Sequence, residues 1–282
     1  MPGSPSLDRA ALLEVLRHGE LTVEGRLVDA SNATLLAGCV LDGVEIACVY
    51  KPTAGERPLW DFPEGTLGMR EVAAYEVGAA LGWDVVPPTV WRDGGPFGQG
   101  MAQAWVSPEG GGEMEPGAGL VDVVDQGRTP PGWLEVVDAH GTGGRPVTLV
   151  HADHPDLRRM CLFDAVVNNA DRKGGHVLVG RVQDGWDVAT YGVDHGVTFS
   201  QDEKLRTVLW GWAGEPVEAE LLADLEVLLE DLEADAGLGA TIAELLTRRE
   251  MTRTIQRVKR RLREGTYPVP GDGWPSLPWP AF

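Results

Sequence analysis

The sequence predicts an α+β fold built as two lobes, a small antiparallel sheet followed by a mainly helical lobe. Three observations predict it: strand-like apolar runs gather in the first hundred residues, a Gly/Pro/Glu-rich segment follows at 107–119, and helical periodicity dominates the second half. The expected organisation is an N-terminal lobe over 1–106, a linker or insert over 107–150, a C-terminal lobe over 151–265 and a proline-rich tail over 266–282.

The elements of the first lobe follow from changes in the spacing of apolar residues. A run at helical intervals stops at His18-Gly19, strand-like runs follow, and Asp42-Gly43 is a tight hairpin signal between two of them. An Ala-rich segment of helical period ends at Gly82, and we expect this helix to pack on the sheet. The predicted elements are, in order, a helix over 7–17, strands over 21–28, 35–41 and 44–51, a helix over 69–81, and strands over 88–91 and 101–106.

The second lobe is organised around one strongly apolar helix. Its Pro155 suits a first helical turn, where the missing N–H is no loss. A hairpin with its turn at 183–185 follows, then an acidic and a basic helix, and the tail is too proline-rich for regular structure. The predicted elements are a strand over 121–125, a helix over 156–168, strands over 176–182 and 186–193, and helices over 217–233 and 240–264.

The composition excludes several classes of protein. Lysine and arginine number 24 against 43 acidic residues, and the net charge of −19 repels nucleic acids and anionic bilayers. No segment reaches the roughly 20 consecutive apolar residues of a membrane helix, and no secretory leader is recognisable. Three cysteines in apolar stretches fit reduced, packed thiols. We therefore expect a cytoplasmic protein without a membrane span or a nucleic-acid partner.

Two aspartates are predicted to meet in one cleft, across the hairpin of the second lobe. Asp171-Arg172-Lys173 follows the apolar helix, and Asp194 follows the hairpin. Phosphoryl transfer from ATP needs this arrangement, because one carboxylate accepts the proton of the acceptor hydroxyl, a second holds Mg²⁺, and a cation neutralises the phosphates. The sequence thus predicts Asp171 as catalytic base and Asp194 as metal ligand. Lys173 is expected near the transferred phosphate, and Arg172 is grouped with these catalytic residues.

His176 occupies the position, five residues after Asp171, where protein kinases carry a metal-binding asparagine. A neutral imidazole is a softer ligand, better matched to Mn²⁺ than to Mg²⁺. The sequence predicts His176 as the second metal ligand, in a modified site or in a protein of weak activity.

The first lobe contains a second, independent indication of a kinase cleft. Lys51 ends an otherwise apolar strand, where a charge needs a partner, and Glu71 lies in the first turn of the helix that follows. A kinase cleft requires such a pair, a strand lysine on the α- and β-phosphates of ATP and a helix glutamate that orients it. The order lysine, glutamate, base and metal aspartate is that of a kinase.

These motifs resemble the phosphatidylinositol 3- and 4-kinase-like superfamily, particularly the type II phosphatidylinositol 4-kinases and the HipA-like bacterial kinases. Tyr50-Lys51-Pro52 looks like their Phe-Lys-Pro strand, and the run from Asp164 to Asn169, Asp171 and Arg172 is similar to their Asp-x4-Asn-x-Asp-Arg. Val193-Asp194-His195-Gly196 resembles their Ile-Asp-Asn-Gly. The whole chain also resembles a bacterial family described only as distantly kinase-like. The resemblance implies an atypical protein-kinase-like fold, an essential Asp171 and a metal-binding Asp194.

Two further groups are assigned to ATP. The first hairpin has no Gly-x-Gly-x-x-Gly, and the turn at 29–34 replaces it, so that Ser31 and Asn32 would hold phosphate through side chains and backbone N–H groups. Trp105-Val106, at the expected hinge between the lobes, is assigned to adenine.

Three other interpretations of these residues are considered beside this one. His176 also fits a pseudokinase, a nucleotide-binding regulatory module without turnover. The run His151-Ala-Asp153-His154 invites a zinc hydrolase, but Leu149 takes the place of a required histidine, and helix capping by Asp153 and His154 is the better interpretation. The basic residues of 253–263 are expected to form a solvated face, although docking to an acidic partner is also considered.

The sequence thus predicts an ATP-dependent phosphotransferase that requires Mg²⁺, with Mn²⁺ as the alternative ion. The strongly acidic charge argues against an enzyme that works on anionic membranes, so a protein hydroxyl or a soluble small molecule is expected as acceptor.

Overall fold

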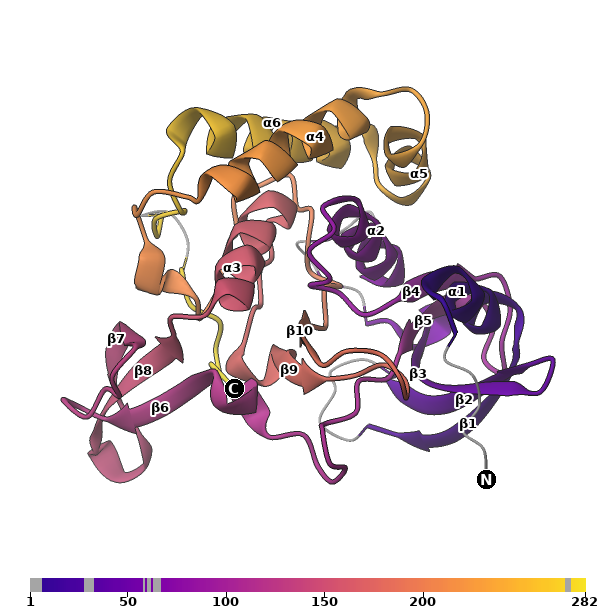
Figure 1. Ribbon diagram of the computed structural model, residues 1–282, viewed down its shortest axis with the longest axis horizontal. Coiled ribbons are helices and arrows are strands. Elements are labelled where there is room, and N and C mark those ends of the chain that lie inside the picture. The colour runs from indigo at the N-terminus through magenta and orange to yellow at the C-terminus, as the bar shows by residue number, and fades with distance from the viewer. Residues whose placement is uncertain (1–6, 28–32, 58, 60–61, 63–66, 272–274) are drawn as a thin grey trace.

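The computed structural model describes residues 7–27, 33–57, 59, 62, 67–271 and 275–282. The described chain is a mixed α+β structure with antiparallel sheets and six α-helices. Figure 1 shows the N-terminal sheet at one side of the molecule, a second sheet at the other, and the helices above and between them. The α+β class predicted from the sequence is confirmed.

The N-terminal sheet has five antiparallel strands in the order β1-β2-β3-β5-β4. Asp42 and Gly43 form the tight turn between β2 and β3, and both have positive φ angles, 49° and 81°, which glycine and aspartate tolerate. The first helix, α1, packs across this sheet and covers a core that includes Leu12 and Leu16. The elements are α1 (Arg9–His18), β1 (Glu20–Arg26), β2 (Leu35–Leu41), β3 (Val44–Pro52), β4 (Thr89–Arg92) and β5 (Gly100–Ala104).

Helix α2 (Leu67–Ala80) lies between the sheet and the helical lobe (Figure 1). It touches β4 and β5 on one side and α5 on the other, and Ala73 and Val77 belong to the same buried core as Phe163 of the helical lobe. Arg70 forms a buried ion pair with Glu250 of α6. The expectation that this helix packs on the sheet is therefore incomplete, because α2 also joins the two lobes.

The segment expected as a linker or insert contains a second sheet, with strand order β6-β8-β7. Its strands are β6 (Val121–Asp125), β7 (Trp133–His140) and β8 (Pro146–Ala152), of which the sequence predicted only β6. Val121 and Leu149 anchor this sheet in the helical core. The outer strand β7 buries none of its residues completely.

The helical lobe consists of α3 (Pro155–Val167), α4 (Ala219–Glu233), α5 (Leu238–Leu245) and α6 (Arg248–Glu264), with a hairpin of β9 (Val177–Gly180) and β10 (Ala189–Gly192) beneath α3. Pro155 occupies the first turn of α3 as expected. The single helix predicted over 240–264 is wrong, because the chain breaks at Leu246. Thr247 then caps α6 in a reciprocal pair of hydrogen bonds with Glu250.

The proline-rich tail has no helix or strand among its described residues and runs back to the hairpin. Ala281 O accepts a hydrogen bond from Gly174 N at 2.7 Å, and the Phe282 ring lies so close that a Cβ on Gly174 would stand 2.3 Å from it. No helix in the described part of the chain is long and apolar enough to cross a membrane.

Candidate functional site

Lys51, at the end of β3, is the centre of a cluster of charged side chains. Its Nζ donates to Glu71 Oε1 at 2.6 Å and to Asp194 Oδ1 at 2.8 Å. Glu71 comes from α2 and is only 1% exposed, whereas Asp194 follows β10 and is half-exposed. One ammonium group therefore connects the sheet, α2 and the hairpin of the second lobe.

The charges of this cluster stabilise one another. Burial by itself would lower the pKa of Lys51, but Asp194 and Glu71 raise it above its ordinary value. The Lys51 ammonium holds the pKa of Asp194 far below its usual range. Burial raises the pKa of Glu71, and Lys51 opposes that rise. Lys51 and Asp194 are consequently both charged at neutral pH.

His176 faces the second oxygen of Asp194. Its Nε2 lies 3.6 Å from Asp194 Oδ2, and burial lowers the pKa of His176 to about 4, so the imidazole is neutral at pH 7. Asp194 itself has a φ of 60°, a left-handed conformation that is uncommon outside glycine and is often found at functional sites. A neutral imidazole and a carboxylate this close can share one cation.

Across the described residues, no group of three or more histidine, cysteine, aspartate or glutamate side chains could hold a metal ion alone. Mg²⁺ is usually bound through one or two carboxylates, with water and substrate phosphates completing its octahedron. The pair of Asp194 and His176 therefore suits an ion that arrives with a phosphorylated ligand, and it does not form a complete metal cage.

Asp171 belongs to the loop between α3 and the hairpin, and hydrogen bonds fix this loop from behind. Asn169 Oδ1 accepts from Asp171 N at 3.0 Å, and Asn169 Nδ2 donates to Asp164 at 3.0 Å. Lys173 Nζ lies 3.2 Å from Asp171 Oδ2. Burial raises the pKa of Asp171, and Lys173 opposes that rise. Asp164 and Asn169 thus support the loop.

Arg172 does not lie with these groups, although the sequence analysis counted it among the catalytic residues. Its side chain is fully buried beneath the loop and forms two-pronged hydrogen bonds with Asp164. It also donates to His195 Nε2 at 2.7 Å and to the backbone oxygens of His176 and Val193. Arg172 is therefore a positioning residue, because it holds both ends of the hairpin and cannot reach a ligand in the cleft.

Two cavities open on this cluster and share Lys51 and Asp194. The first has a volume of about 270 Å³ and is mostly apolar. It lies between the two lobes, and Trp105 and Val106 line it as expected, with Trp105 N donating to Ala47 O. Its other walls come from Leu27, Thr34, Val49, Gln103, Ala104, Met114, Leu178 and Val193.

The second cavity has a volume of about 560 Å³ and is lined by Lys51, Glu71, Asp171 and Asp194. The expected convergence of Lys51, Asp171 and Asp194 on one cleft is thus confirmed as geometry. Ser31 and Asn32, assigned to phosphate in the sequence analysis, lie outside the described residues.

Sequence reasoning missed several residues that line these cavities. Gln103, Leu178 and Val193 form walls of the apolar cavity, and Arg206 joins the charged one. Their positions result from pairing between distant strands and from the path of the 202–208 segment, for which the sequence holds no local signal. Arg206 lies beside the Asp171 loop because its backbone N donates a hydrogen bond to Asn169 O.

The residues of the zinc-hydrolase alternative are engaged elsewhere. His151 Nε2 accepts from Gly211 N at 3.0 Å, and Asp153 accepts from Arg158 and Trp212. His154 caps α3 by accepting from Asp156 N. These contacts give each group a structural role, as expected for His154.

The fold and site define an α+β protein with a cleft between a five-stranded sheet and a helical lobe, in which a lysine, a glutamate and two aspartates meet. No family model matches the sequence. The chain is 48% identical over 275 residues to the protein named Rv2133c of Mycobacterium tuberculosis (strain ATCC 25618 / H37Rv), which covers 95% of this chain and 94% of that protein. The chain therefore belongs to the same family as that mycobacterial protein.

Proposed function

We propose that this protein is an ATP-dependent phosphotransferase with a kinase-like two-lobed fold. The observation that carries the proposal is the convergence of Lys51, Asp171 and Asp194 on one cavity, next to an apolar cavity between the lobes that Lys51 and Asp194 also line. An adenine ring requires a flat apolar slot, and a triphosphate requires cations beside it. The two neighbouring cavities offer one of these environments each, as the two parts of ATP require.

The adenine would occupy the apolar cavity beside Trp105 and Val106. Lys51 would then neutralise the phosphates, and Glu71 would hold the lysine in place with the 2.6 Å contact described above. Asp194 and His176 are the residues that would hold Mg²⁺ or Mn²⁺, and such an ion would draw negative charge from the phosphates.

Asp171 would serve as the base that receives the acceptor proton. In the transfer, the acceptor oxygen forms a bond to the γ-phosphorus, the bond to the bridging oxygen of ADP breaks, and Asp171 takes the hydroxyl proton. Burial raises the pKa of Asp171, which makes its carboxylate a better proton acceptor than an exposed aspartate. Lys173, 3.2 Å from Asp171, would balance the charge of the phosphoryl group.

The direct test incubates the protein with γ-labelled ATP, Mg²⁺ or Mn²⁺ and a cell extract. Labelled product should form with the wild type, and Asp171→Asn should lower the rate by about 10²–10⁴-fold, the usual contribution of a positioned base. Gly175→Ala is a matched control on the same loop, because its added Cβ meets no atom within 4 Å. Equal labelling by wild type and Asp171→Asn would contradict the assignment of Asp171.

A nucleotide-binding module without turnover is the second candidate, and His176 favours it. A neutral imidazole beside Asp194 is a softer and poorer ligand for Mg²⁺ than the asparagine oxygen that kinases carry at this position. Thermal stabilisation by ATP and a divalent ion, without any release or transfer of labelled phosphate, would support this candidate over the enzyme.

A further inference from the structure

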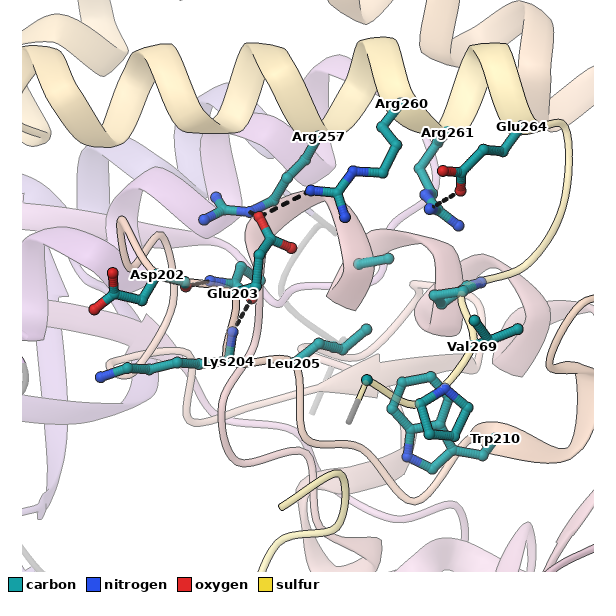
Figure 2. A pocket seen from close by; sticks show the side chains of 15 residues that line it. Asp202, Glu203, Lys204, Leu205, Trp210, Arg257, Arg260, Arg261, Glu264 and Val269 are labelled. Carbon is teal, nitrogen blue, oxygen red and sulfur yellow. Dashed lines mark hydrogen bonds and ion pairs between the residues drawn. The ribbon is translucent and has the colours of Figure 1, made fainter. Parts of the chain in front are cut away.

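A third cavity, of about 740 Å³, lies in the helical lobe and is separate from the cleft. Two chain segments contribute to both this cavity and the cleft. Asn168 and Leu205 line this cavity, whereas Asp171 and Arg206, close to them in sequence, line the charged cavity of the cleft. Figure 2 shows three arginines of α6 that hang into the cavity from one side, with Trp210 and Val269 at the other end. We name it the arginine cavity.

Arg257 is the buried cation of this cavity. It is 3% exposed, and its Nη2 donates to Ser200 O. Its Nε lies 3.4 Å from Glu203 Oε1, and neither Nε nor Nη1 has a hydrogen-bond partner within the part of the chain that the structure describes. A buried guanidinium with unused nitrogens retains much of its desolvation cost, and an anion hydrogen-bonded to Nε would remove part of that cost.

Glu203 already occupies part of the place that such an anion would take. Its Oε1 contacts both Arg257 and Arg260, the latter at 3.1 Å (Figure 2). A single carboxylate oxygen thus serves two guanidinium groups, although each of them can bind two oxygens of one anion. The Glu203 side chain is 55% exposed and belongs to a loop, so it can leave for solvent when a stronger anion arrives.

The other two cations of the cavity, Arg261 and Lys204, make contacts that leave them unsuited to binding an anion there. Arg261 is engaged by Glu264 and donates to Thr266 O. Lys204 points away from the arginines in Figure 2, and its Nζ lies over the Phe62 ring. Arg257 and Arg260 therefore form the anion-binding part of the cavity.

The remaining wall of the cavity is apolar. Trp210 is 7% exposed and its Nε1 donates to Ser276 O, so the indole is fixed in place. Leu205, Val269 and the two prolines beside Val269 complete this wall. An aromatic or apolar body fits such a surface, and the cavity volume exceeds what an inorganic anion would fill.

From these contacts we infer that the arginine cavity binds a soluble small molecule that carries a phosphomonoester on an aromatic or apolar body. The phosphate would take the place of the Glu203 carboxylate between Arg257 and Arg260, and the body would lie against Trp210. A dianionic phosphate competes better than a monoanionic carboxylate for two guanidinium groups. A soluble ligand is favoured over a lipid headgroup, because the net charge of −19 repels anionic bilayers and Arg257 is buried inside the cavity.

Calorimetric titration with phenyl phosphate at pH 7.5 tests this inference. The wild type should bind, and Arg260→Gln should weaken binding by about tenfold, the usual value of a charge-assisted hydrogen bond. Glu203→Gln should instead tighten binding several-fold, because the competing carboxylate is gone. Arg253→Gln removes a positive charge from an exposed position of the same helix that does not line the cavity. This variant should leave the affinity unchanged.

The Lys51→Met variant distinguishes binding in the arginine cavity from binding in the cleft. This distinction holds whatever the function of the cleft is. Phenyl phosphate binding that persists in Lys51→Met and weakens in Arg260→Gln assigns it to the arginine cavity. Binding that is lost in Lys51→Met, or that weakens equally in Arg260→Gln and Arg253→Gln, overturns the inference, as does the absence of binding to the wild type. These results do not depend on ATP turnover.

Two further probes test the chemical class of the ligand. Inorganic phosphate should bind several-fold more weakly than phenyl phosphate, and equal affinities would contradict the role of the Trp210 wall. Vesicles that contain phosphatidic acid present the same phosphomonoester on a lipid. Arg260-dependent sedimentation with those vesicles would overturn the assignment to a soluble ligand.

Discussion

Two buried arginines of the helical lobe, Arg172 and Arg257, differ in how completely their charges are compensated. Arg172 is fully buried and is paired with Asp164, with His195 and with two backbone oxygens. Arg257 is nearly as buried, but it has one backbone oxygen and a long contact with the half-exposed Glu203. Burial lowers the pKa of Arg257 to about 10, which reflects this poor compensation.

The contrast separates two uses of a buried charge. The partners of Arg172 all belong to the fold, so this guanidinium fixes the loop of Asp171 and the hairpin of Asp194. Arg257 keeps unused hydrogen-bonding capacity beside a cavity, as expected of a group that binds something from outside the chain. Breaking the first arrangement should therefore cost stability, and altering the second should mainly change binding.

The largest expected effect is that of Asp164→Asn. Removal of this carboxylate leaves Arg172 buried without its counter-charge, which should lower the free energy of unfolding by about 3–5 kcal/mol. Arg257→Met is the matched variant, because it replaces a poorly compensated charge with an apolar chain, and it should change the stability by less than about 1 kcal/mol or increase it. Urea denaturation of both variants measures the difference. The opposite ranking of the two losses would contradict the comparison.

Gly192→Ala perturbs the surroundings of Arg172 without removing any charge. An added Cβ would stand 2.7 Å from Arg172 Nη2, so the guanidinium must shift away from Asp164. Overpacking of this kind should cost up to about 3 kcal/mol and should also lower the activity of the cleft. Gly175→Ala, whose Cβ meets nothing within 4 Å, should leave the thermal midpoint unchanged. A similar effect of both substitutions would show that Arg172 is not tightly held.

The buried His151 extends the comparison to a side chain that is neutral in the folded protein and takes up a proton on acidification. Burial lowers its pKa from 6.5 to about 4, and its Nε2 accepts from Gly211 N, which a protonated ring cannot do. Because the unfolded chain binds the proton more readily, stability is complete above pH 6.5 and is lost as the pH falls toward 4. The loss between pH 6.5 and 5 should be about 2 kcal/mol. Denaturation of wild type and His151→Gln at both values tests this, and an equal pH dependence in the variant would refute it.

Glu203→Gln should have the smallest effect on stability. An ion pair that involves a half-exposed carboxylate contributes less than about 1 kcal/mol, and salt screens it further. Denaturation at 0.1 M and 1 M salt should therefore show little difference between this variant and the wild type. A loss of several kcal/mol would mean that Glu203 is a structural partner of Arg257, and the comparison with Arg172 would then fail.

The sequence predicted most of the fold because its elements are locally encoded. The Asp42-Gly43 turn and the first-turn Pro155 mark boundaries that the structure confirms. Strands β7 and β8 were missed although both contain apolar residues, Leu134 and Val136 in β7 and Val147 and Leu149 in β8. The Gly- and Pro-rich turns on both sides of β7 favoured a linker instead. The α5–α6 break was missed although Thr247 and Glu250 have the Thr-x-x-Glu spacing of a capping box, which marks the start of a helix in a sequence.

The candidate site was predicted to a similar extent. The convergence of Lys51, Asp171 and Asp194 followed from motif order, since each side chain sits at the end of an element that the sequence identifies. The burial of Arg172 could not be predicted from the sequence, because it depends on how the hairpin folds over α3. Arg257 was expected on a solvated face, and this is wrong, because the 202–205 loop and the tail cover that part of α6. Such burial arises from chain segments that carry no periodic signal.

We propose that Lys51 belongs to a site for the phosphates of ATP, and calorimetric titration with a non-hydrolysable ATP analogue and Mg²⁺ measures this binding. The wild type should bind, and Lys51→Met should lose about tenfold or more in affinity, the usual value of a charge-assisted contact, whereas Arg253→Gln should leave the affinity unchanged. Absence of binding to the wild type, or equal affinities for wild type and Lys51→Met, would contradict it.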